Sequence, residues 1–224
     1  MITSAANERL KLVRKLHDGR WRDKLGLFVV EGEDLVAAGR AADVEPVDVL
    51  VAGEDVEPEL LASVSGLPHP PRVVAVYRRA DLPGNTSMLG IALWRVADPG
   101  NVGAIVRTAG AFGGSVALSP GCADPTAARA LRASAGAIFR VPLVDFDEAP
   151  GRRVALVAHG GRPLADASLE QPVTFVLGAE RDGLPPEVVE RCDEAATIPT
   201  SETVESLNVA AAAAIALYEA SRRT

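Results

Sequence analysis

The residues with the clearest chemical potential stand just before an alanine-rich stretch near the C-terminus. Polar side chains crowd this position, and they are Ser201, Thr203, Ser206 and Asn208. One capping side chain is enough to begin a helix, so the additional hydroxyls indicate a helix end that holds a ligand. The alanines that follow at 210–214, 216 and 220 would let the helix backbone pack closely against a neighbour.

A second candidate is an arginine on a bare helix surface. The stretch "DPGNVGAIVRTAGAFG" (98–113) opens with a Pro-Gly turn and a possible capping residue, Asn101, and its apolar residues recur at helical spacing. Arg107 lies off that apolar stripe, beside two glycines and an alanine at i−4, i+3 and i+4. Glycines inside a helix cost about 1 kcal/mol each relative to alanine. They indicate close approach of a backbone or a substrate; a surface arginine beside incidental glycines is the alternative.

A third candidate follows an apolar strand in "VTFVLGAERDGLPPEVV" (173–189). Gly178 comes directly after the strand, where a missing side chain would let a flat ligand lie against the main chain. Backbone amides and carbonyls there could read an adenine edge, and an ordinary strand-to-helix turn is the alternative. Neither the GxxxxGK[ST] nor the GxGxxG nucleotide-binding pattern occurs in the chain.

Strands that alternate with helices must position these candidates. After residue 88 the apolar runs "MLGIALWRV", "GSVALSP", "RVALVAH" and "VTFVLG" are separated by helical patterns. This alternation predicts a parallel sheet covered on both faces. Ligands bind such sheets at the loops beyond the carboxyl ends of the strands, and those loops are 98–101, 158–161, 178–184 and 198–206.

Residues 1–80 predict a smaller α/β domain. Helical spacing covers 7–16, and short apolar strands are expected at 26–32, 47–53 and 72–78. The turn-forming stretch 81–87 is the predicted linker. The second domain is predicted to span 88–224.

Composition limits the class of protein. The chain has 224 residues, enough for one good core or two modest ones. Two cysteines far apart in sequence predict neither a disulfide framework nor a metal cluster. The longest apolar run is too short to cross a bilayer, and no stretch of signal-peptide type begins the chain, so a soluble cytoplasmic protein is expected.

The net charge is −7, but basic residues gather in 8–24 and 72–140. Basic patches are typical of nucleic-acid binding, and solvated surface charge is the alternative.

Taken together, the motifs closely resemble those of the SpoU-type (TrmH-like) RNA ribose 2′-O-methyltransferases of the SPOUT superfamily. The stretches "NVGAIVRTAGAFG", "LGAERDGL" and "IPTSETVESLNVAAAAAIALYE" stand in the family's order and at roughly its spacing. The segment "ALRASAGAIFRVP" (130–142) is similar to the family's intervening segment. The N-terminal "LKLVRKLHDGRWRDKLGLFVVEG" resembles the ribosomal-protein-like substrate-binding domain that many members carry.

The resemblance implies a fold, a cofactor and an assembly. The C-terminal domain would be a parallel-sheet SPOUT domain with a deep trefoil knot, an exception to the rule that chains do not thread loops. The protein would use S-adenosylmethionine and act as a homodimer. By motif position, the cofactor would contact Ala158, Gly178, Ile198 and Leu207. The reacting centre would comprise Arg107, Asn101, Glu180, Ser206 and Asn208.

The substrate implied by the resemblance is the ribose 2′-hydroxyl of structured RNA, either ribosomal or transfer RNA, with ribosomal RNA favoured. Arginine stacks on bases and binds phosphates in two-point contacts, and the predicted RNA contacts are Arg20, Arg22, Arg129, Arg132 and Arg140. One departure is Glu202, where many members have glycine. A catalytically silent RNA-binding or ribosome-assembly protein is one alternative function, and methylation at a base is another.

The chemistry of Arg107 follows from its basicity. A guanidinium has a pKa above about 12 and is effectively never deprotonated in proteins. We therefore expect Arg107 to stabilise developing alkoxide charge and to orient an adjacent phosphate, rather than to act as the base. The proton would leave to phosphate or water.

Overall fold

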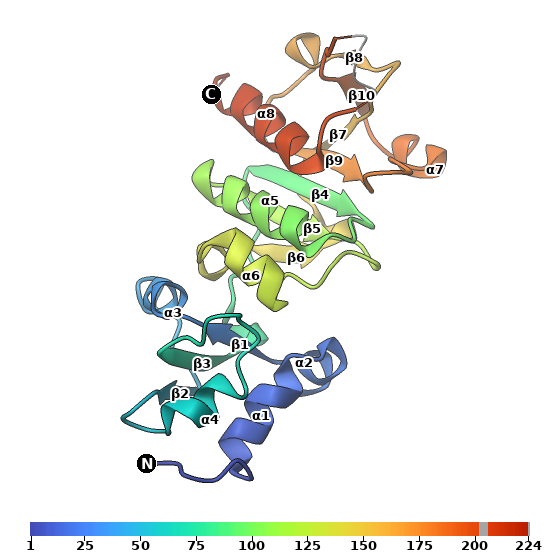
Figure 1. Cartoon of the computed structure of the whole chain (residues 1–224). Coiled ribbons are helices and arrows are strands. Elements are labelled where there is room, and N and C mark those ends of the chain that lie inside the picture. Colours follow the sequence, from blue (N-terminus) through green and yellow to red (C-terminus); the bar gives the residue numbers. More distant parts are fainter. Residues whose placement is uncertain (202–205, 224) are drawn as a thin grey trace. The chain divides into compact units, whose positions relative to one another are not determined.

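The computed structural model describes residues 1–201 and 206–223 and divides the chain into two compact units (Figure 1). Unit 1 comprises Met1–Leu82 with Asp124–Arg140, and unit 2 comprises Pro83–Ala123 with Val141–Thr224. The chain first passes between the units inside the predicted linker, 81–87. The segment Asp124–Arg140 was expected in the second domain, but it packs in unit 1 because its apolar residues cover the N-terminal sheet.

Unit 1 is a small antiparallel sheet with helices on both faces. Its strands are β1 (Leu27–Glu31), β2 (Asp48–Val51) and β3 (Val73–Arg78), in the order β1-β3-β2. Its α-helices are α1 (Glu8–Leu16), α2 (Gly19–Leu25), α3 (Glu33–Arg40), α4 (Pro58–Ala62) and α6 (Ala128–Ser134). Short 3-10 turns are η1 (Arg79–Asp81) and η2 (Ala137–Phe139). The predicted N-terminal helix and the three predicted strands are confirmed.

The two faces of this sheet have different partners. Leu10, Val13 and Leu16 of α1 pack with Leu61 of α4 and with Val74 of β3 in one apolar cluster. α1 begins there because Asn7 accepts a hydrogen bond from the backbone of Arg9 at 2.9 Å and caps the helix.

The opposite face is aromatic and is closed by the second segment of unit 1. The Tyr77 ring lies 5.8 Å from the Phe28 ring and 4.9 Å from the Phe139 ring. All three rings are buried, and Phe139 belongs to η2, more than forty positions beyond the predicted linker. The N-terminal sheet therefore depends on residues from the middle of the chain.

The Tyr77 hydroxyl carries a testable consequence. It is buried and has no hydrogen-bond partner among the described residues, and burial raises its pKa. A buried polar group without a partner destabilises the fold. We expect Tyr77→Phe to raise the free energy of unfolding by about 1 kcal/mol, measured by urea denaturation. Tyr218→Phe, at an exposed tyrosine, is the matched control and is expected to be neutral. A loss of stability in the Tyr77 variant would contradict this assignment.

Unit 2 is built on an all-parallel sheet of seven strands in the order β6-β5-β4-β9-β7-β10-β8. The strands are β4 (Leu89–Trp94), β5 (Ser115–Leu118), β6 (Leu143–Asp145), β7 (Arg152–Leu156), β8 (Arg162–Pro163), β9 (Val173–Gly178) and β10 (Glu194–Thr197). The α-helices are α5 (Pro99–Ala111), α7 (Pro186–Val189) and α8 (Val209–Ser221), and the 3-10 turns are η3 (Phe146–Glu148) and η4 (Leu164–Asp166).

Helices cover both faces of this sheet, as the alternation of strands and helices predicts. α5 and α8 lie side by side on one face and contact β4, β5 and β9 (Figure 1). On the other face, Phe146 of η3 and Val188 of α7 pack with Ala92, Ala117 and Val176 of the sheet. None of the helices in residues 1–201 and 206–223 is long and apolar enough to span a membrane.

Candidate functional site

A pocket opens at the carboxyl edge of the unit 2 sheet. It is lined by the ends of β7, β9 and β10 and by the segment that leads into α8. Each of the predicted cofactor-contact residues lines it, and they are Ala158, Gly178, Ile198 and Leu207. Glu180 and Ser206, from the predicted reacting centre, line it as well. The sheet thus brings together loops that lie far apart in sequence.

The walls of this pocket are mainly apolar. Leu156, Leu177 and Val209 contribute aliphatic side chains, and Glu180 is the charged residue among the described lining residues. Pockets of this kind, with apolar walls and a few polar groups at one end, bind small organic molecules. Backbone amides and carbonyls of the loops at the strand ends can add hydrogen bonds in the plane of a flat ring.

The main chain passes very close to Gly178. A Cβ built on Gly178 would lie only 2.0 Å from the carbonyl oxygen of Gly183. The loop between them turns back on itself, since the backbone N–H of Gly183 donates to the carbonyl of Ala179 at 2.9 Å. The missing side chain therefore makes room for the returning main chain of this loop, although Gly178 also lines the pocket.

A chain of hydrogen bonds joins α5, the loop after β9 and α8. Asn101 Nδ2 donates to Glu180 Oε1 at 2.6 Å, and Asn208 Nδ2 donates to Asn101 Oδ1 at 3.1 Å. Asn208 is also the N-cap of α8, where its Oδ1 accepts from the backbone of Ala210 and Ala211 at 2.9 and 3.3 Å. Three of the predicted reacting-centre residues therefore lie together.

The donors and acceptors in this chain can be oriented in one consistent way. Because Asn208 Oδ1 is occupied by the start of α8, its amide nitrogen faces Asn101. Asn101 must then receive that proton on oxygen and offer its own nitrogen to an acceptor, and a carboxylate such as Glu180 can only accept. The arrangement holds two helix ends beside the pocket.

We therefore expect Asn208→Asp to lower the free energy of unfolding by about 1 kcal/mol. Aspartate remains a good N-cap, but it would present oxygen to the Asn101 oxygen and reverse the hydrogen-bond chain toward Glu180. Urea denaturation measures the effect. Asn208→Ser keeps a capping oxygen without the added charge and should lose less. Equal stability of wild type and Asn208→Asp would show that the chain of hydrogen bonds contributes nothing.

Arg107 lies on α5 outside the pocket lining. Its side chain is exposed, and it has no hydrogen bond or ion pair with any other residue that the structure describes. Gly110 and Ala111 are exposed on the same helix, and Ile215 and Tyr218 are exposed on α8, which packs beside it. We call these four residues the α5/α8 strip. Arg107 is thus free to meet a partner from outside this unit.

The predicted RNA-contact arginines fall into two groups. Arg20, Arg129, Arg132 and Arg140 are exposed, although Arg140 donates to the Ala41 carbonyl and Arg129 also has a partner. Arg22, in contrast, is only 6% exposed. Its Nη1 donates to the carbonyls of Leu16 and His17, each at 2.9 Å, at the end of α1. This position is at odds with a role in RNA binding.

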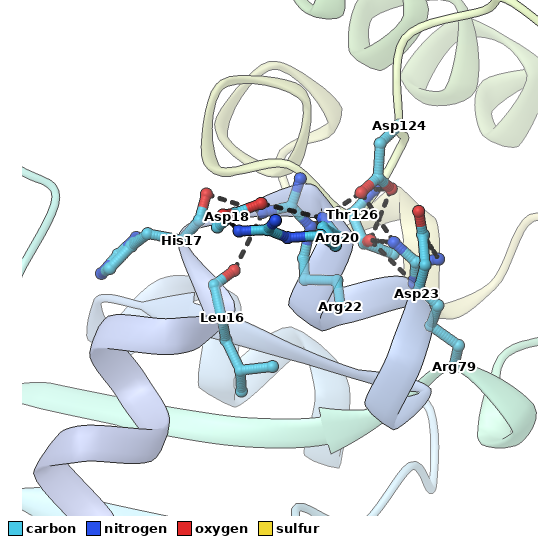
Figure 2. A network of polar contacts seen from close by, with 9 residues as sticks. All are labelled: Leu16, His17, Asp18, Arg20, Arg22, Asp23, Arg79, Asp124 and Thr126. Atoms are coloured by element: carbon cyan, nitrogen blue, oxygen red, sulfur yellow. Dashed lines mark hydrogen bonds and ion pairs between the residues drawn. The ribbon is translucent and has the colours of Figure 1, made fainter.

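Figure 2 shows what holds Arg22 in place. Its Nε donates to Asp124 at 2.7 Å, and Arg79 Nη2 donates to the same carboxylate at 2.6 Å. Burial would raise the pKa of Asp124, but hydrogen bonds from Thr126 and Arg22, with the charge of Arg79, lower it below its usual range. We call Arg22, Arg79, Asp124 and Thr126 the Asp124 cluster. It fastens the middle segment of unit 1 to the N-terminal part, which local sequence patterns do not reveal.

Glu202, Thr203 and the two cysteines are the remaining residues that the sequence analysis singled out. Glu202 and Thr203 lie outside the described residues. Cys122 and Cys192 are free thiols, and in residues 1–201 and 206–223 no group of three or more His, Cys, Asp or Glu side chains is arranged to hold a metal ion.

Comparison with known proteins gives consistent matches along the chain. Residues 88–218 match the model of the SpoU rRNA Methylase family. An uncharacterised tRNA/rRNA methyltransferase of Synechocystis is 31% identical, over 99% of this chain and 93% of the relative. The 23S rRNA (guanosine(2553)-2′-O)-methyltransferase RlmP of Bacillus subtilis is 30% identical, over 97% of each chain.

Solved structures resemble the whole chain as well. The AdoMet-bound rRNA methyltransferase of Sinorhizobium meliloti superposes with a TM-score of 0.88 and 27% identity, over 99% of this chain and 97% of that one. The SpoU methyltransferase AviRb of Streptomyces viridochromogenes, in complex with AdoMet, has a TM-score of 0.85 and 26% identity, over 97% of this chain and 98% of that one.

Proposed function

The chain belongs to the SpoU rRNA methylase family, and on that premise we propose that it transfers a methyl group from S-adenosylmethionine to a ribose 2′-hydroxyl of RNA. The observation that carries the proposal is the pocket at the carboxyl edge of the sheet. It gathers Ala158, Gly178, Ile198 and Leu207 from four separate segments. Two similar structures bear AdoMet, and one relative is named as a 2′-O-methyltransferase.

The substrate is ribosomal rather than transfer RNA in this proposal. The name of the Bacillus subtilis relative specifies 23S rRNA, and that relative aligns with nearly the whole of this chain. Exposed arginines of unit 1, including Arg20 and Arg132, supply the positive charge that RNA phosphates attract. The protein would act in the cytoplasm, where RNA is available and free thiols remain reduced.

The residues of the pocket fit S-adenosylmethionine. Its aliphatic walls suit the adenine ring, and Glu180 offers a negative charge to a cationic ligand. When bound, the cofactor supplies an electrophilic methyl group on a sulfonium. The protein then mainly has to align the 2′-oxygen with that methyl group and manage its proton. Asn101 and Asn208 position the loops, and Ser206 adds a hydroxyl to the pocket wall.

Arg107 would stabilise the negative charge that develops on the attacking oxygen. Its exposure and its lack of a partner among the described residues leave its five donors free for an oxygen or a phosphate. The proton itself passes to phosphate or water, because a guanidinium does not give up its own proton at neutral pH.

A homodimer belongs to the same proposal. The α5/α8 strip presents apolar surface on the two helices beside Arg107, and the half-buried Phe112 extends it, with its ring 6.4 Å from the Tyr218 ring. A second copy that covers the strip about a twofold axis would remove this surface from water. The trefoil knot is proposed too, supported by β9 and β10, which lie between strands formed by earlier segments.

The test combines binding, transfer and assembly. Titration of S-adenosylmethionine into the purified protein should give heat, and RNA from cells that lack the gene should accept radioactive methyl groups. Alkaline hydrolysis then identifies the position, since a 2′-O-methyl group blocks cleavage of the next phosphodiester. Sedimentation should show a dimer. Cofactor binding without transfer would favour a silent RNA-binding protein, and a cleavable methylated product would favour base methylation.

A further inference from the structure

A second groove, with several charged residues in its lining, opens at the same edge of the unit 2 sheet, on the other side of β9. It is lined by the segments that follow β4, β5 and β9, together with the start of α5. Ala179, Glu180 and Gly183 line both this groove and the apolar pocket described above. The two hollows therefore share a wall, as the sites for two reactants of one transfer should.

Arg95 stands in this groove with an unusual backbone. Its φ is 55°, in the left-handed region that costs a residue with a side chain about 1–2 kcal/mol. Its backbone N–H donates to Ser119 Oγ at 2.9 Å. A Cβ built on Gly121 would lie 3.4 Å from Arg95 Nε, so the arginine side chain runs along Gly121. The fold thus holds Arg95 in a conformation that glycine would adopt more readily, and such strain is a mark of function.

The charged side chains of the groove differ in whether they already have hydrogen-bond partners. The side chains of Arg95 and Arg181 are exposed and make no hydrogen bond or ion pair with another described residue. Two of the groove's acids, Asp98 and Glu180, already accept hydrogen bonds from Asn101 at 2.9 and 2.6 Å. The third acid, Asp182, is exposed. The guanidinium groups of Arg95 and Arg181 therefore have the most hydrogen-bond donors available for a ligand.

An aromatic side chain completes the lining. Trp94 ends β4 and is partly buried against Phe146, with ring centroids 5.1 Å apart. Indole rings stack on nucleic-acid bases, and guanidinium groups bind phosphate oxygens in two-point contacts. A groove with both groups, next to a pocket for a methyl donor, matches a single RNA strand better than a free phosphate.

We infer that this groove holds the RNA strand that carries the reacting ribose, with a phosphodiester of that strand bound by Arg95. Arg181, from the loop after β9, is the second cation of the site, and Trp94 is the surface for a base. The inference rests on the proposed function, and it adds a substrate site on the β4 side of β9, whereas the cofactor pocket lies on the β7 side. Arg95 is a binding residue in this assignment, distinct from Arg107.

The experiment compares four variants of the full-length protein. Arg95→Ala removes the guanidinium, and Arg95→Lys keeps the charge without the two-point geometry. Arg95→Gly removes the side chain and also relieves the left-handed backbone. Arg191→Ala is the control, since Arg191 is exposed, does not line the groove and is already paired with Asp147 at 2.9 Å. Binding of a fluorescein-labelled oligouridine is measured over a range of salt concentrations, together with methyl transfer to RNA from cells that lack the gene.

We expect Arg95→Ala to raise the KM for RNA about tenfold, with kcat changed less than about twofold because the methyl donor's pocket is intact. The logarithm of the RNA-binding constant decreases with the logarithm of the salt concentration, and the steepness of this decrease should be smaller by roughly 0.7 to 1 in Arg95→Ala. This difference corresponds to the loss of one phosphate contact. Arg95→Lys should keep the wild-type slope with an intermediate KM. Arg95→Gly should weaken RNA binding as alanine does, yet unfold at no lower temperature than wild type.

Three results would overturn the inference. They are an unchanged salt slope in Arg95→Ala, an equal loss of RNA affinity in Arg191→Ala, and absence of oligouridine binding by the wild-type protein. Failure of the proposed function is recognised separately, because the wild type would then give no heat with S-adenosylmethionine and transfer no methyl group, whatever the salt slope shows.

Discussion

Replacing Arg107 by alanine is expected to lower the rate of methyl transfer by about a hundredfold or more. The loss arises because the developing charge on the ribose oxygen would have no guanidinium donor. Binding of S-adenosylmethionine should change little, since Arg107 does not line the apolar pocket. Stability should also be preserved, since the side chain is exposed and unpaired within the described residues. Single-turnover transfer, calorimetric titration and urea denaturation measure the three quantities.

Arg107→Lys separates charge from geometry. Lysine keeps the positive charge but offers a single nitrogen in place of the planar fork, so its transfer rate should lie well below that of wild type. A lysine variant that turned over like wild type would refute the geometric part of this role. Arg191→Ala, at an exposed arginine paired with Asp147, is the matched control and should transfer methyl groups normally.

Replacing Gly178 by alanine is expected to have the second large effect, on both stability and cofactor binding. The new methyl group would lie 2.0 Å from the Gly183 carbonyl oxygen and 2.5 Å from the Leu184 nitrogen. Neither is the movable end of a side chain, so the loop itself must shift. We expect a loss of roughly 3 kcal/mol in the free energy of unfolding and a strong loss of S-adenosylmethionine affinity, because the loop forms one wall of the pocket.

Gly84→Ala is the control for this change. A Cβ at Gly84 meets no atom within 4 Å, so alanine there should be neutral or slightly stabilising. Urea denaturation and calorimetric titration compare the two variants. Normal stability and normal cofactor affinity of Gly178→Ala would mean that the loop after β9 is not packed as described.

The sequence predicted best those parts of the fold that depend on local hydrophobic patterns. The apolar runs after residue 88 predict the parallel sheet with helices on both faces, and the loops at its carboxyl edge follow from that architecture. The predicted contact residues Ala158, Gly178, Ile198 and Leu207 line one pocket. Their roles toward the cofactor remain predictions, and so do the roles of Arg107 and Ser206 in the reaction.

Interactions between distant segments were beyond the reach of local patterns. Arg22 looks like a surface cation on a basic helix, and only the fold shows that Asp124, 102 positions away, buries it. The position of Gly178 was predicted, but the reason for it was not, because its clash partner Gly183 is set by the return of the loop. Arg95 carries no sequence signal, since a left-handed φ at an arginine becomes visible only in coordinates.

Unit 1 is formed by two separate segments of the chain, and this limits where the protein can be cut into fragments that fold. Phe139 closes the aromatic face of the N-terminal sheet, and the Asp124 cluster ties that same middle segment to Arg22 and Arg79. A fragment that stopped at the linker would lack both, and the remainder would keep α6 and η2 without the sheet that their buried residues cover. Unit 1 is therefore not a module that ends at the linker: a graft that transplants it into another enzyme must carry residues 124–140 with it.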